Sequence, residues 1–249
     1  MSGSLYLEKI GGIISEIRAS QLEKIEEAAK IMADSIAGGH LVHLFGSGHS
    51  VIPVMDVFPR YGSFVGFHPL LDPRLMWFNV VGPGGARELL WLEREPGYVS
   101  NFLQSFEFHP KDTLWVFSHS GLNAAPVEAA IYAKDKGVPV VAVVSGDNHK
   151  RAHATHSSGK KLGDLADVVI DNCVPLEDAL VYVEGFDFPV AAGSTVAAAA
   201  IACAIVAEVA KLLVAAGIQP SVFVSPNVKG IGAGHNQGVF VEYARRMSR

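Results

Sequence analysis

The sequence predicts a doubly wound α/β fold, in which a parallel sheet lies between two layers of helices. Four apolar runs, 40–45, 113–117, 139–144 and 167–170, lack the alternation of apolar and polar residues that a strand with one solvated face shows. Continuous runs of this kind are typical of strands that are buried on both faces of a parallel sheet. Helical patterns precede and separate these runs, and the order of strand, turn, helix and strand is that of a flavodoxin-like three-layer sandwich.

Composition and charge narrow the classes of function. The chain has 249 residues, of which 49% are hydrophobic and 18% are charged, which suits one globular domain over residues 1–249. The net charge of −5 and the pI near 6.0 indicate neither a nucleic-acid partner nor an anionic membrane partner. A small anionic ligand fits this balance, because helix N-termini bind phosphate without net positive charge.

The remaining global features indicate a cytoplasmic protein. Cys173 and Cys203 lie in apolar runs without a C-x-x-C spacing, which suits two buried thiols in a reducing compartment. The N-terminus lacks the basic and apolar regions of a secretory signal. The uncharged, alanine-rich segment from Val190 to Ala207 is barely long enough to cross a membrane, and we expect a helix buried in the core or at a subunit interface.

The other elements follow from periodicity and from turn residues. Apolar residues at three- and four-residue steps predict one long N-terminal helix over about 5–37 and a second helix over 124–135. Prolines and interleaved aromatic residues in 58–87 predict strand fragments and loops near a site. Residues 220–249 are expected to form a glycine-rich loop and a closing helix over 239–246, so both ends of the chain are appendages to the sheet.

A glycine-rich turn, Gly46-Ser47-Gly48-His49-Ser50, follows the first apolar run. Glycine lets the backbone turn sharply and approach a ligand closely. The helix expected after the turn would present its N-terminus, which attracts phosphate. Val51 stands where a dinucleotide-binding G-x-G-x-x-G turn has its third glycine, so that class of site is not indicated. Taken alone, this sequence is equally that of an ordinary tight turn.

A second turn of the same kind, Ser118-His119-Ser120-Gly121-Leu122-Asn123, follows the run at 113–117. Both turns would lie at the carboxyl edge of one parallel sheet, which is where ligands bind in open α/β folds. Two hydroxyl-rich turns on one edge therefore predict a phosphate pocket more strongly than either turn does.

These motifs resemble the SIS (sugar isomerase) domain, and in particular a subgroup of stand-alone proteins similar to phosphoheptose isomerases. The resemblance covers about 22–213 and depends on the two turns together with the segments 156–161 (HSSGKK) and 167–172 (DVVIDN). SIS domains occur in phosphosugar isomerases, in a sugar-phosphate etherase, in glucosamine-phosphate synthase and in sugar-sensing regulators. The resemblance therefore implies the fold and the ligand class more strongly than it implies a reaction.

Carried onto this sequence, the resemblance implies a phosphate cradle of Ser47, Ser50, Ser118, Ser120 and Asn123. We add Gly48, His49 and His119 as candidates because they lie within the same two turns. His49 and His119 would either contact the ligand or pair with backbone carbonyls. Ser194 and Thr195, at the start of the alanine-rich helix, match the place of a further hydroxyl pair in the family, and Ser194 would also serve as the N-cap of that helix.

The resemblance also implies acid–base residues, because moving a carbonyl along a sugar requires a proton to be removed beside it. In the family a glutamate from the region of Glu88, Glu93 and Glu95 does such work, and we favour Glu95. The alternative for this cluster is a solvated acidic helix face. His235, in a glycine-rich loop, matches a C-terminal histidine that family members place over the sugar ring for ring opening.

Three histidines, His149, His153 and His156, are spaced as ligands on one helix face would be. The adjacent Ser157-Ser158-Gly159 favours a solvated loop instead, and we expect no metal.

The leading hypothesis is a cofactor-free phosphosugar isomerase that acts as a homodimer or homotetramer, with its sites near the subunit interface. One alternative is a sugar-phosphate sensor without turnover. The other is a sugar-phosphate lyase or etherase, which would use the same glutamates.

Overall fold

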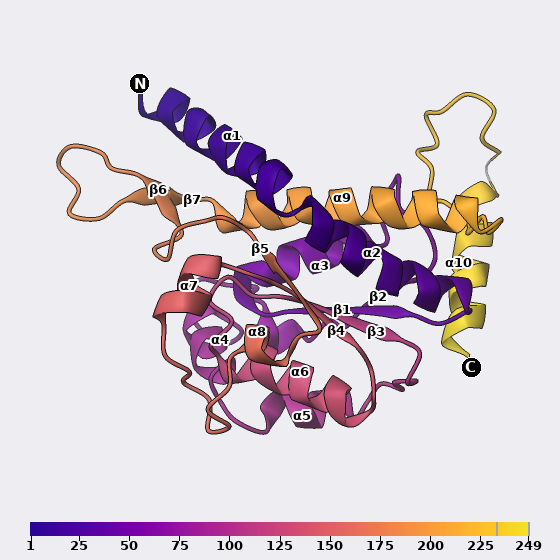
Figure 1. Cartoon of the computed structure of the whole chain (residues 1–249), viewed down its shortest axis with the longest axis horizontal. Coiled ribbons are helices and arrows are strands. Elements are labelled where there is room, and N and C mark those ends of the chain that lie inside the picture. The colour runs from indigo at the N-terminus through magenta and orange to yellow at the C-terminus, as the bar shows by residue number, and fades with distance from the viewer. Residues whose placement is uncertain (233, 249) are drawn as a thin grey trace.

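Figure 1 shows the protein as a computed structural model, which describes residues 1–232 and 234–248. The helices are α1 (Ser2–Ser20), α2 (Leu22–Ala37), η1 (Gly48–Ser50), α3 (Val51–Val57), η2 (Pro73–Leu75), α4 (Ala86–Leu92), α5 (Tyr98–Leu103), α6 (Ala124–Asp135), α7 (Gly146–Arg151), α8 (Leu162–Leu165), α9 (Ser194–Ala215) and α10 (His235–Met247). The strands are β1 (Val42–Gly46), β2 (Phe67–Pro69), β3 (Thr113–Phe117), β4 (Val140–Val144), β5 (Val168–Asp171), β6 (Ala179–Val181) and β7 (Val190–Ala192).

The central sheet confirms the predicted fold class. Within the described residues it has five strands in the order β2-β1-β3-β4-β5, and every neighbouring pair is parallel. The four apolar runs of the sequence form β1, β3, β4 and β5, while β2 comes from the proline-rich segment. The order reverses between β1 and β3, so the loops after these two strands flank the crevice in which doubly wound folds bind ligands.

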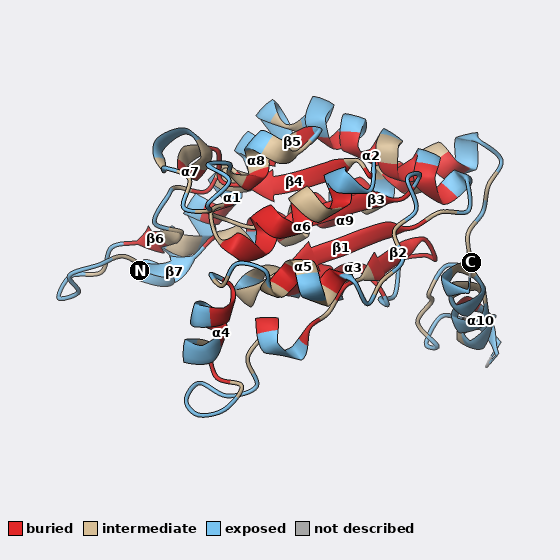
Figure 2. Cartoon of the chain, turned by 90° about the horizontal axis from the view of Figure 1, so that it is seen from below, coloured by how far each residue is buried: buried red, intermediate tan, exposed pale blue. Residues whose placement is uncertain are grey.

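Two hydrophobic clusters cover the two faces of the sheet, as Figure 2 shows by the buried residues on both sides of the strands. Successive residues of a strand point to opposite faces: in β3, Trp115 packs in the cluster with α2, α3 and α9, and Val116 packs in the cluster with α4, α5, α6 and α8. Apolar residues on both faces are needed for this three-layer arrangement, which explains the strands without alternation.

The N-terminal segment contains two helices, so the prediction of one helix over 5–37 was wrong. The break is at Gln21, whose side-chain carbonyl accepts a hydrogen bond from the backbone N–H of Asp171 at the end of β5 (3.0 Å). From this point α2 packs on the sheet, while α1 extends along the β6–β7 hairpin (Figure 1). Lys9 of α1 donates to the carbonyl of Leu180 in that hairpin (2.7 Å). The helical periodicity of the sequence is continuous, but α1 and α2 pack on different parts of the molecule, and the chain therefore breaks between them.

The first residues of the alanine-rich segment, Val190–Ala192, form the strand β7 instead of a helix. Most of the segment is helical as predicted and belongs to α9, which packs on α2 and α3. Its length and its mean hydropathy of 2.2 would also allow it to cross a membrane, and 39% of the apolar window is buried inside the protein. Ile201, Ile205 and Val209 face the core, whereas Val196 and Val214 are exposed. One face of α9 is therefore buried and another is exposed, although apolar residues occur on all sides of the helix.

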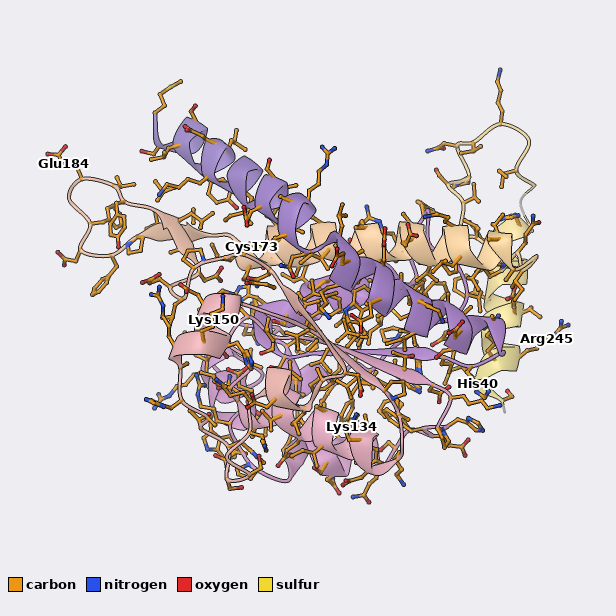
Figure 3. All side chains as sticks on the ribbon, viewed as in Figure 1. His40, Lys134, Lys150, Cys173, Glu184 and Arg245 are labelled. Atoms are coloured by element: carbon orange, nitrogen blue, oxygen red, sulfur yellow. The ribbon has the colours of Figure 1, made fainter. Side chains whose placement is uncertain are left out.

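Two elements lie outside the three layers, at opposite ends of the molecule. The β6–β7 hairpin, with Glu184 near its tip, projects at one end, and α10, with Arg245, lies at the other (Figure 3). The closing helix was predicted over 239–246 and is confirmed, although it begins earlier, at His235.

Candidate functional site

The first turn folds tightly because residue 46 has no side chain. A Cβ built on Gly46 would lie 2.3 Å from the carbonyl oxygen of Ser50, which is closer than any side chain tolerates. Gly48 has a positive φ of 60°, a conformation that glycine adopts without strain. The chain therefore leaves β1, reverses direction and enters η1 and α3 directly, so that the start of this helical stretch lies at the edge of the sheet.

The second turn is stabilised by hydrogen bonds to the hydroxyl groups of its own serines. Ser118 Oγ accepts a hydrogen bond from the backbone N–H of Gly121 (3.1 Å), and Ser120 Oγ accepts one from Leu122 (3.4 Å). A hydroxyl that accepts in this way keeps its proton for donation to another group. These contacts hold both serines in place as donors at the entry to α6, where Asn123 occupies the N-cap position.

The two turns meet at one cavity of about 310 Å³, a size at the lower end of the range for small-molecule sites. Eight of the predicted phosphate-binding residues line it: Ser47, Gly48, His49, Ser50, Ser118, His119, Ser120 and Asn123. Trp77, Ala86, Leu89, Leu90 and Glu93 complete the wall. Among these described lining residues there is no lysine or arginine, so an anion in the cavity would be bound by hydroxyls and backbone N–H groups.

Glu93 is the carboxylate of this cavity. Its side chain is buried, and its Oε2 accepts a hydrogen bond from Ser47 Oγ at 2.9 Å. Its Oε1 lies 3.4 Å from Nη1 of the exposed Arg94. Burial raises the pKa of Glu93 above the ordinary glutamate value, although hydrogen bonds from Ser47 and Asn123 and the charge of Arg94 oppose that shift. A carboxyl group with a raised pKa at a cavity wall is a candidate for proton exchange with a bound ligand.

Glu95, which the sequence analysis favoured, is not among the described residues that line the cavity. The reason lies in the end of α4: Glu93, the C-cap residue, follows Leu89 by four residues and shares its buried face, whereas Glu95 lies two residues beyond that cap. The i, i+4 relation to the apolar Leu89 is the sequence signal that would have distinguished the two. Trp77, whose ring lies 4.4 Å from that of His49, was also missed as a site residue.

His235 likewise lies far in space from the cavity of its own chain. It begins α10, at the opposite end of the molecule from α4 (Figure 1), and its Nε2 lies 2.8 Å from the carbonyl oxygen of Val222. The structure therefore does not bring His235 to the two turns of the same chain.

His119 separates the main cavity from a smaller one. Its Nδ1 lies 3.2 Å from Asn172 Nδ2, and its Nε2 lies 3.4 Å from Asn148 Nδ2, so the ring is held from both sides. The smaller pocket, of about 20 Å³, has room for about one water molecule and is lined by Ser194 and Thr195. This pair lies behind His119 and Ser50 instead of on the main cavity wall.

Ser194 is not the N-cap that the sequence predicted. Gly193 occupies that position, and Ser194 is the first helical residue. The hydroxyl of Ser194 donates to Asp178 Oδ2 (2.8 Å), while Asp178 Oδ1 accepts from the backbone N–H of Ser194 (2.7 Å). The carboxylate of Asp178, from the turn before β6, therefore does the capping that the sequence assigned to Ser194.

The histidines at 149–156 separate in space. His149 lies on α7 with its Nε2 3.8 Å from Asp164, whereas the half-buried His156 has a side chain that is only 8% exposed, with its Nε2 3.6 Å from Glu128. Within the described residues no group of three His, Cys, Asp or Glu side chains is arranged to hold a metal ion. The segment was expected to be a solvated loop, yet His156 is enclosed through its contact with α6.

Comparison with protein families and curated proteins places these features in a known group. The SIS domain model matches residues 5–145. A UPF0309 protein of Caldanaerobacter subterraneus is 35% identical over 246 residues, which are 98% of either chain. A UPF0309 protein of Listeria monocytogenes is 34% identical over 242 residues, 97% of this chain and 96% of the relative.

Solved structures share the fold at much lower identity. A phosphoheptose isomerase from Francisella tularensis superposes with a TM-score of 0.53 at 15% identity, over 84% of this chain and 95% of its own. The protein c3406 of E. coli CFT073, solved in complex with a sugar phosphate, superposes with a TM-score of 0.51 at 14% identity, over 84% of this chain and 88% of its own. At these identities the likeness is one of fold.

Proposed function

This chain belongs to the SIS-domain family, and on that premise we propose that it binds a sugar phosphate and interconverts its aldose and ketose forms without a cofactor. One observation carries the proposal: two serine-rich turns, from strands on either side of the point where the sheet order reverses, meet a buried glutamate at one cavity. The solved sugar-phosphate complex of c3406 supports the ligand class on this fold.

The phosphate would lie between the two turns. Ser118 and Ser120 are held as hydroxyl donors by the backbone of their own loop. Ser50 lines the same cavity from the first turn, where the Ser47 hydroxyl donates to Glu93. The N-termini of the helical stretch after β1 and of α6 add the positive ends of helix dipoles. In α6 the Ala125 N–H already donates to the Glu93 carbonyl (3.0 Å). This arrangement binds an anion without cationic side chains, which agrees with the acidic net charge of the chain.

Glu93 is then the base. With the phosphate fixed, the sugar carbon chain extends along the wall formed by Trp77 and Leu89 toward the carboxylate. Glu93 removes a proton from the carbon beside the carbonyl, and the resulting enediol takes the same proton back on the neighbouring carbon. The carbonyl oxygen also gains a proton, and the hydroxyl oxygen on the neighbouring carbon loses one as it becomes the new carbonyl; His49 lies at the same cavity for this exchange. No net oxidation occurs, so the reaction needs no redox cofactor.

A thermal-shift series tests binding. Because a ligand that binds only the folded state raises the melting temperature by mass action, we expect one sugar phosphate of a panel to raise it and the matching unphosphorylated sugar to leave it unchanged. Ser120→Ala should weaken that effect without lowering the melting temperature of the free protein by more than a few degrees. A panel without any effective sugar phosphate would contradict the proposed ligand class.

Turnover is tested separately with the compound that binds. NMR of the sugar in D₂O detects both the isomerised product and exchange of the proton beside the carbonyl. We expect Glu93→Gln to lower kcat by at least about a hundredfold, as loss of a general base does, and to retain binding. Glu95→Gln is the matched control and should leave kcat nearly unchanged. Binding without any exchange in the wild-type protein would instead support the non-catalytic sensor.

A further inference from the structure

The segment 156–161, one of the motifs that carry the family resemblance, has no part in the proposed reaction. The residues on either side of it bind the second serine-rich turn. Thr155 Oγ1 donates a hydrogen bond to the carbonyl of Leu122 (2.7 Å), and the backbone N–H of Leu162 donates to the carbonyl of Gly121 (2.9 Å). The segment is therefore docked at the start of α6, where it can act on the sugar-phosphate cavity through that helix.

Hydrogen bonds within the segment fix the ring of His156. The backbone N–H of Ser158 donates to His156 Nδ1 (3.2 Å), so this nitrogen is an acceptor and the neutral ring carries its proton on Nε2. The Nε2 atom lies 3.6 Å from Oε1 of Glu128 in α6, which is an electrostatic contact longer than a hydrogen bond. Both side chains are almost fully enclosed by the protein.

Glu128 in turn holds the chain that follows Glu93. Its Oε1 accepts a hydrogen bond from the backbone N–H of Gly97 (2.5 Å). Its Oε2 accepts from the backbone N–H and from the hydroxyl of Ser100, at 3.4 Å each. Gly97 has a positive φ of 85° and is the N-cap of α5. One buried carboxylate therefore fixes the turn that joins α4 to α5.

The first turn of α6 also holds Glu93 itself. The backbone N–H of Ala125 donates to the Glu93 carbonyl (3.0 Å), and the Asn123 side chain hydrogen-bonds to the Glu93 carboxylate. With Gly97 bound to Glu128, the stretch from Glu93 to Gly97 is fixed at both ends. Glu128 is not among the described residues that line the sugar-phosphate cavity, so it acts on a bound ligand only through the residues that it holds.

On the premise that Glu93 is the base of the proposed function, we propose that Glu128 and His156 are positioning residues that hold it at the cavity wall. Glu128 supplies the acceptors for the turn at Gly97, and His156 covers the same carboxylate from the docked segment. A shift of a reacting group by about 1 Å costs about a hundredfold in rate. Loss of either anchor therefore lowers kcat, while the serine-rich turns still bind the phosphate.

The first test reads the position of Glu93 without any substrate. NMR titration of its side-chain carboxyl carbon reports how far the group is desolvated, since burial is the largest cause of its raised pKa. We expect Glu128→Gln and His156→Leu each to lower the titration midpoint toward that of an exposed glutamate. Glutamine has one acceptor oxygen where Glu128 has two, so a donor of the turn loses its partner. His156→Leu leaves every carboxylate in place, and Arg94 and His49 are unchanged in both variants.

Proton exchange of the bound sugar phosphate in D₂O gives the second reading. Glu128→Gln and His156→Leu should each lower the exchange rate by about tenfold or more and change KM by less than about threefold. In the background of Glu93→Gln, the same substitutions should change the remaining rate by less than about twofold. The reason is that a positioning residue acts only through the base that it holds.

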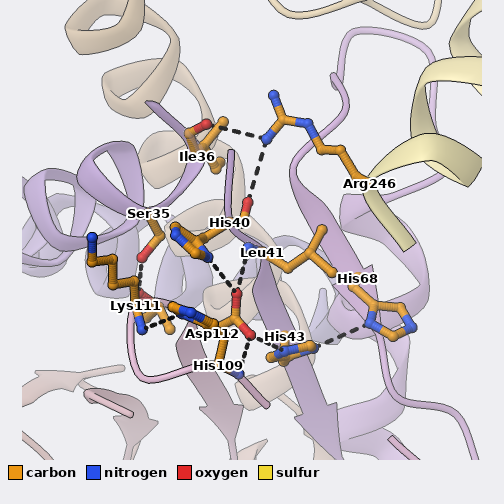
Figure 4. Close-up of polar contacts among 11 residues, drawn as sticks. Ser35, Ile36, His40, Leu41, His43, His68, His109, Lys111, Asp112 and Arg246 are labelled. Atoms are coloured by element: carbon orange, nitrogen blue, oxygen red, sulfur yellow. Dashed lines mark hydrogen bonds and ion pairs between the residues drawn. The ribbon is translucent and has the colours of Figure 1, made fainter. Parts of the chain in front are cut away.

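Two controls separate positioning from stability. Asp112 immediately precedes β3 and lies in the polar cluster of Figure 4, at the edge of the sheet opposite the serine-rich turns. It too is a buried carboxylate that accepts backbone hydrogen bonds. Asp112→Asn should therefore destabilise the fold as Glu128→Gln does, but leave kcat and the Glu93 midpoint unchanged. His153→Leu, at an exposed histidine on the same loop as the tested one, should change neither quantity.

An unchanged Glu93 midpoint in either variant, or equal effects of Glu128→Gln with and without Glu93, would overturn the positioning role. A drop in kcat of the same size in Asp112→Asn would also overturn it, because the loss would then come from lower stability. If both midpoints fall but the wild-type protein exchanges no proton of any bound sugar phosphate, the isomerase reaction fails. The positioning of Glu93 at the cavity wall is supported in that case, as part of a binding site.

Discussion

At the scale of the single residue, burial of the Glu93 carboxylate lowers the stability of the fold, and the same residue is the proposed catalytic base. Ser47 and Asn123 hydrogen-bond to it, yet desolvation dominates and raises its pKa. An acid with a raised pKa in the folded state holds its proton more tightly there than in the unfolded chain. Its contribution to stability is therefore greatest in acid and declines as pH rises from the ordinary carboxyl range to the raised pKa. Such costs are common where stability is given up for function.

We expect Glu93→Gln to increase the free energy of unfolding at neutral pH, because it removes a partly desolvated charge. The gain should vanish below about pH 4, where the glutamate is protonated in both states. Urea unfolding at the two pH values measures the difference. Glu95→Gln, on the half-buried neighbour outside the cavity, should change stability by less than about 0.5 kcal/mol at either pH. A loss of stability in Glu93→Gln at neutral pH would contradict the desolvation argument.

The pKa of Asp112 is shifted in the opposite direction, below the ordinary aspartate value. Desolvation by itself would raise its pKa, but hydrogen bonds from His43, Leu41 and His109 outweigh it and lower the pKa to about 2. A lowered pKa contributes stability above the ordinary aspartate value, and this contribution is lost as pH falls from about 4 to about 2.

Asp112→Asn should therefore lose about 2 kcal/mol of stability at neutral pH. The gap between variant and wild type should close on acidification through the same interval. Asp34→Asn, at an exposed ion pair with Lys30, is the matched control and should cost less than about 1 kcal/mol at any pH. A gap that persists undiminished at about pH 2 would show that the carboxylate charge is not the source of the effect.

At the scale of the element, the turn after β1 depends on the absence of a side chain at residue 46. A methyl group there would overlap the Ser50 carbonyl, which would push the start of the following helical stretch away from the sheet. The phosphate-binding donors of the first turn would move with it.

Gly46→Ala is expected to destabilise the protein by about 1–3 kcal/mol, as overpacking does, and to weaken sugar-phosphate binding. Gly12→Ala is the control: this glycine lies in α1 with open space around it, and alanine there should stabilise the helix by up to about 1 kcal/mol. Thermal melts with and without the sugar phosphate measure both effects. Unchanged stability and binding in Gly46→Ala would mean that the turn can relax around the methyl group.

At the scale of the whole molecule, α9 leaves an apolar face uncovered. Val196 and Val214 are exposed near its two ends. Cys203 is exposed between them and Cys173 is half-buried, so the prediction of two buried thiols was wrong. Burying such a face in a second copy of the chain would follow the usual logic of homo-oligomers.

We expect a homodimer or homotetramer by sedimentation velocity, with α9 at the interface. Cys203→Glu should shift the protein to monomer, because a single unpaired carboxylate at the centre of an apolar interface is costly. Val228→Glu, in the exposed loop before α10, should leave the mass unchanged. A wild-type monomer at micromolar concentration, or an unchanged mass for Cys203→Glu, would rule this interface out.

Local sequence determined the sheet and the serine-rich turns. Continuous apolar runs can satisfy a strand only between two helical layers, and glycine at 46 and serines at 118 and 120 act through contacts within a few residues of themselves. The strand order then places both turns on one cavity, because parallel strands share an edge.

The i, i+4 relation to Leu89 already distinguishes Glu93 from Glu95 in the sequence, whereas tertiary structure alone decided where the N-terminal helix breaks and how the histidines group. Gln21 is held by the end of β5. Asp112 meets His43 and His68 only after distant strands pair. Each of these outcomes depends on contacts between segments far apart in the chain, which periodicity and spacing do not report.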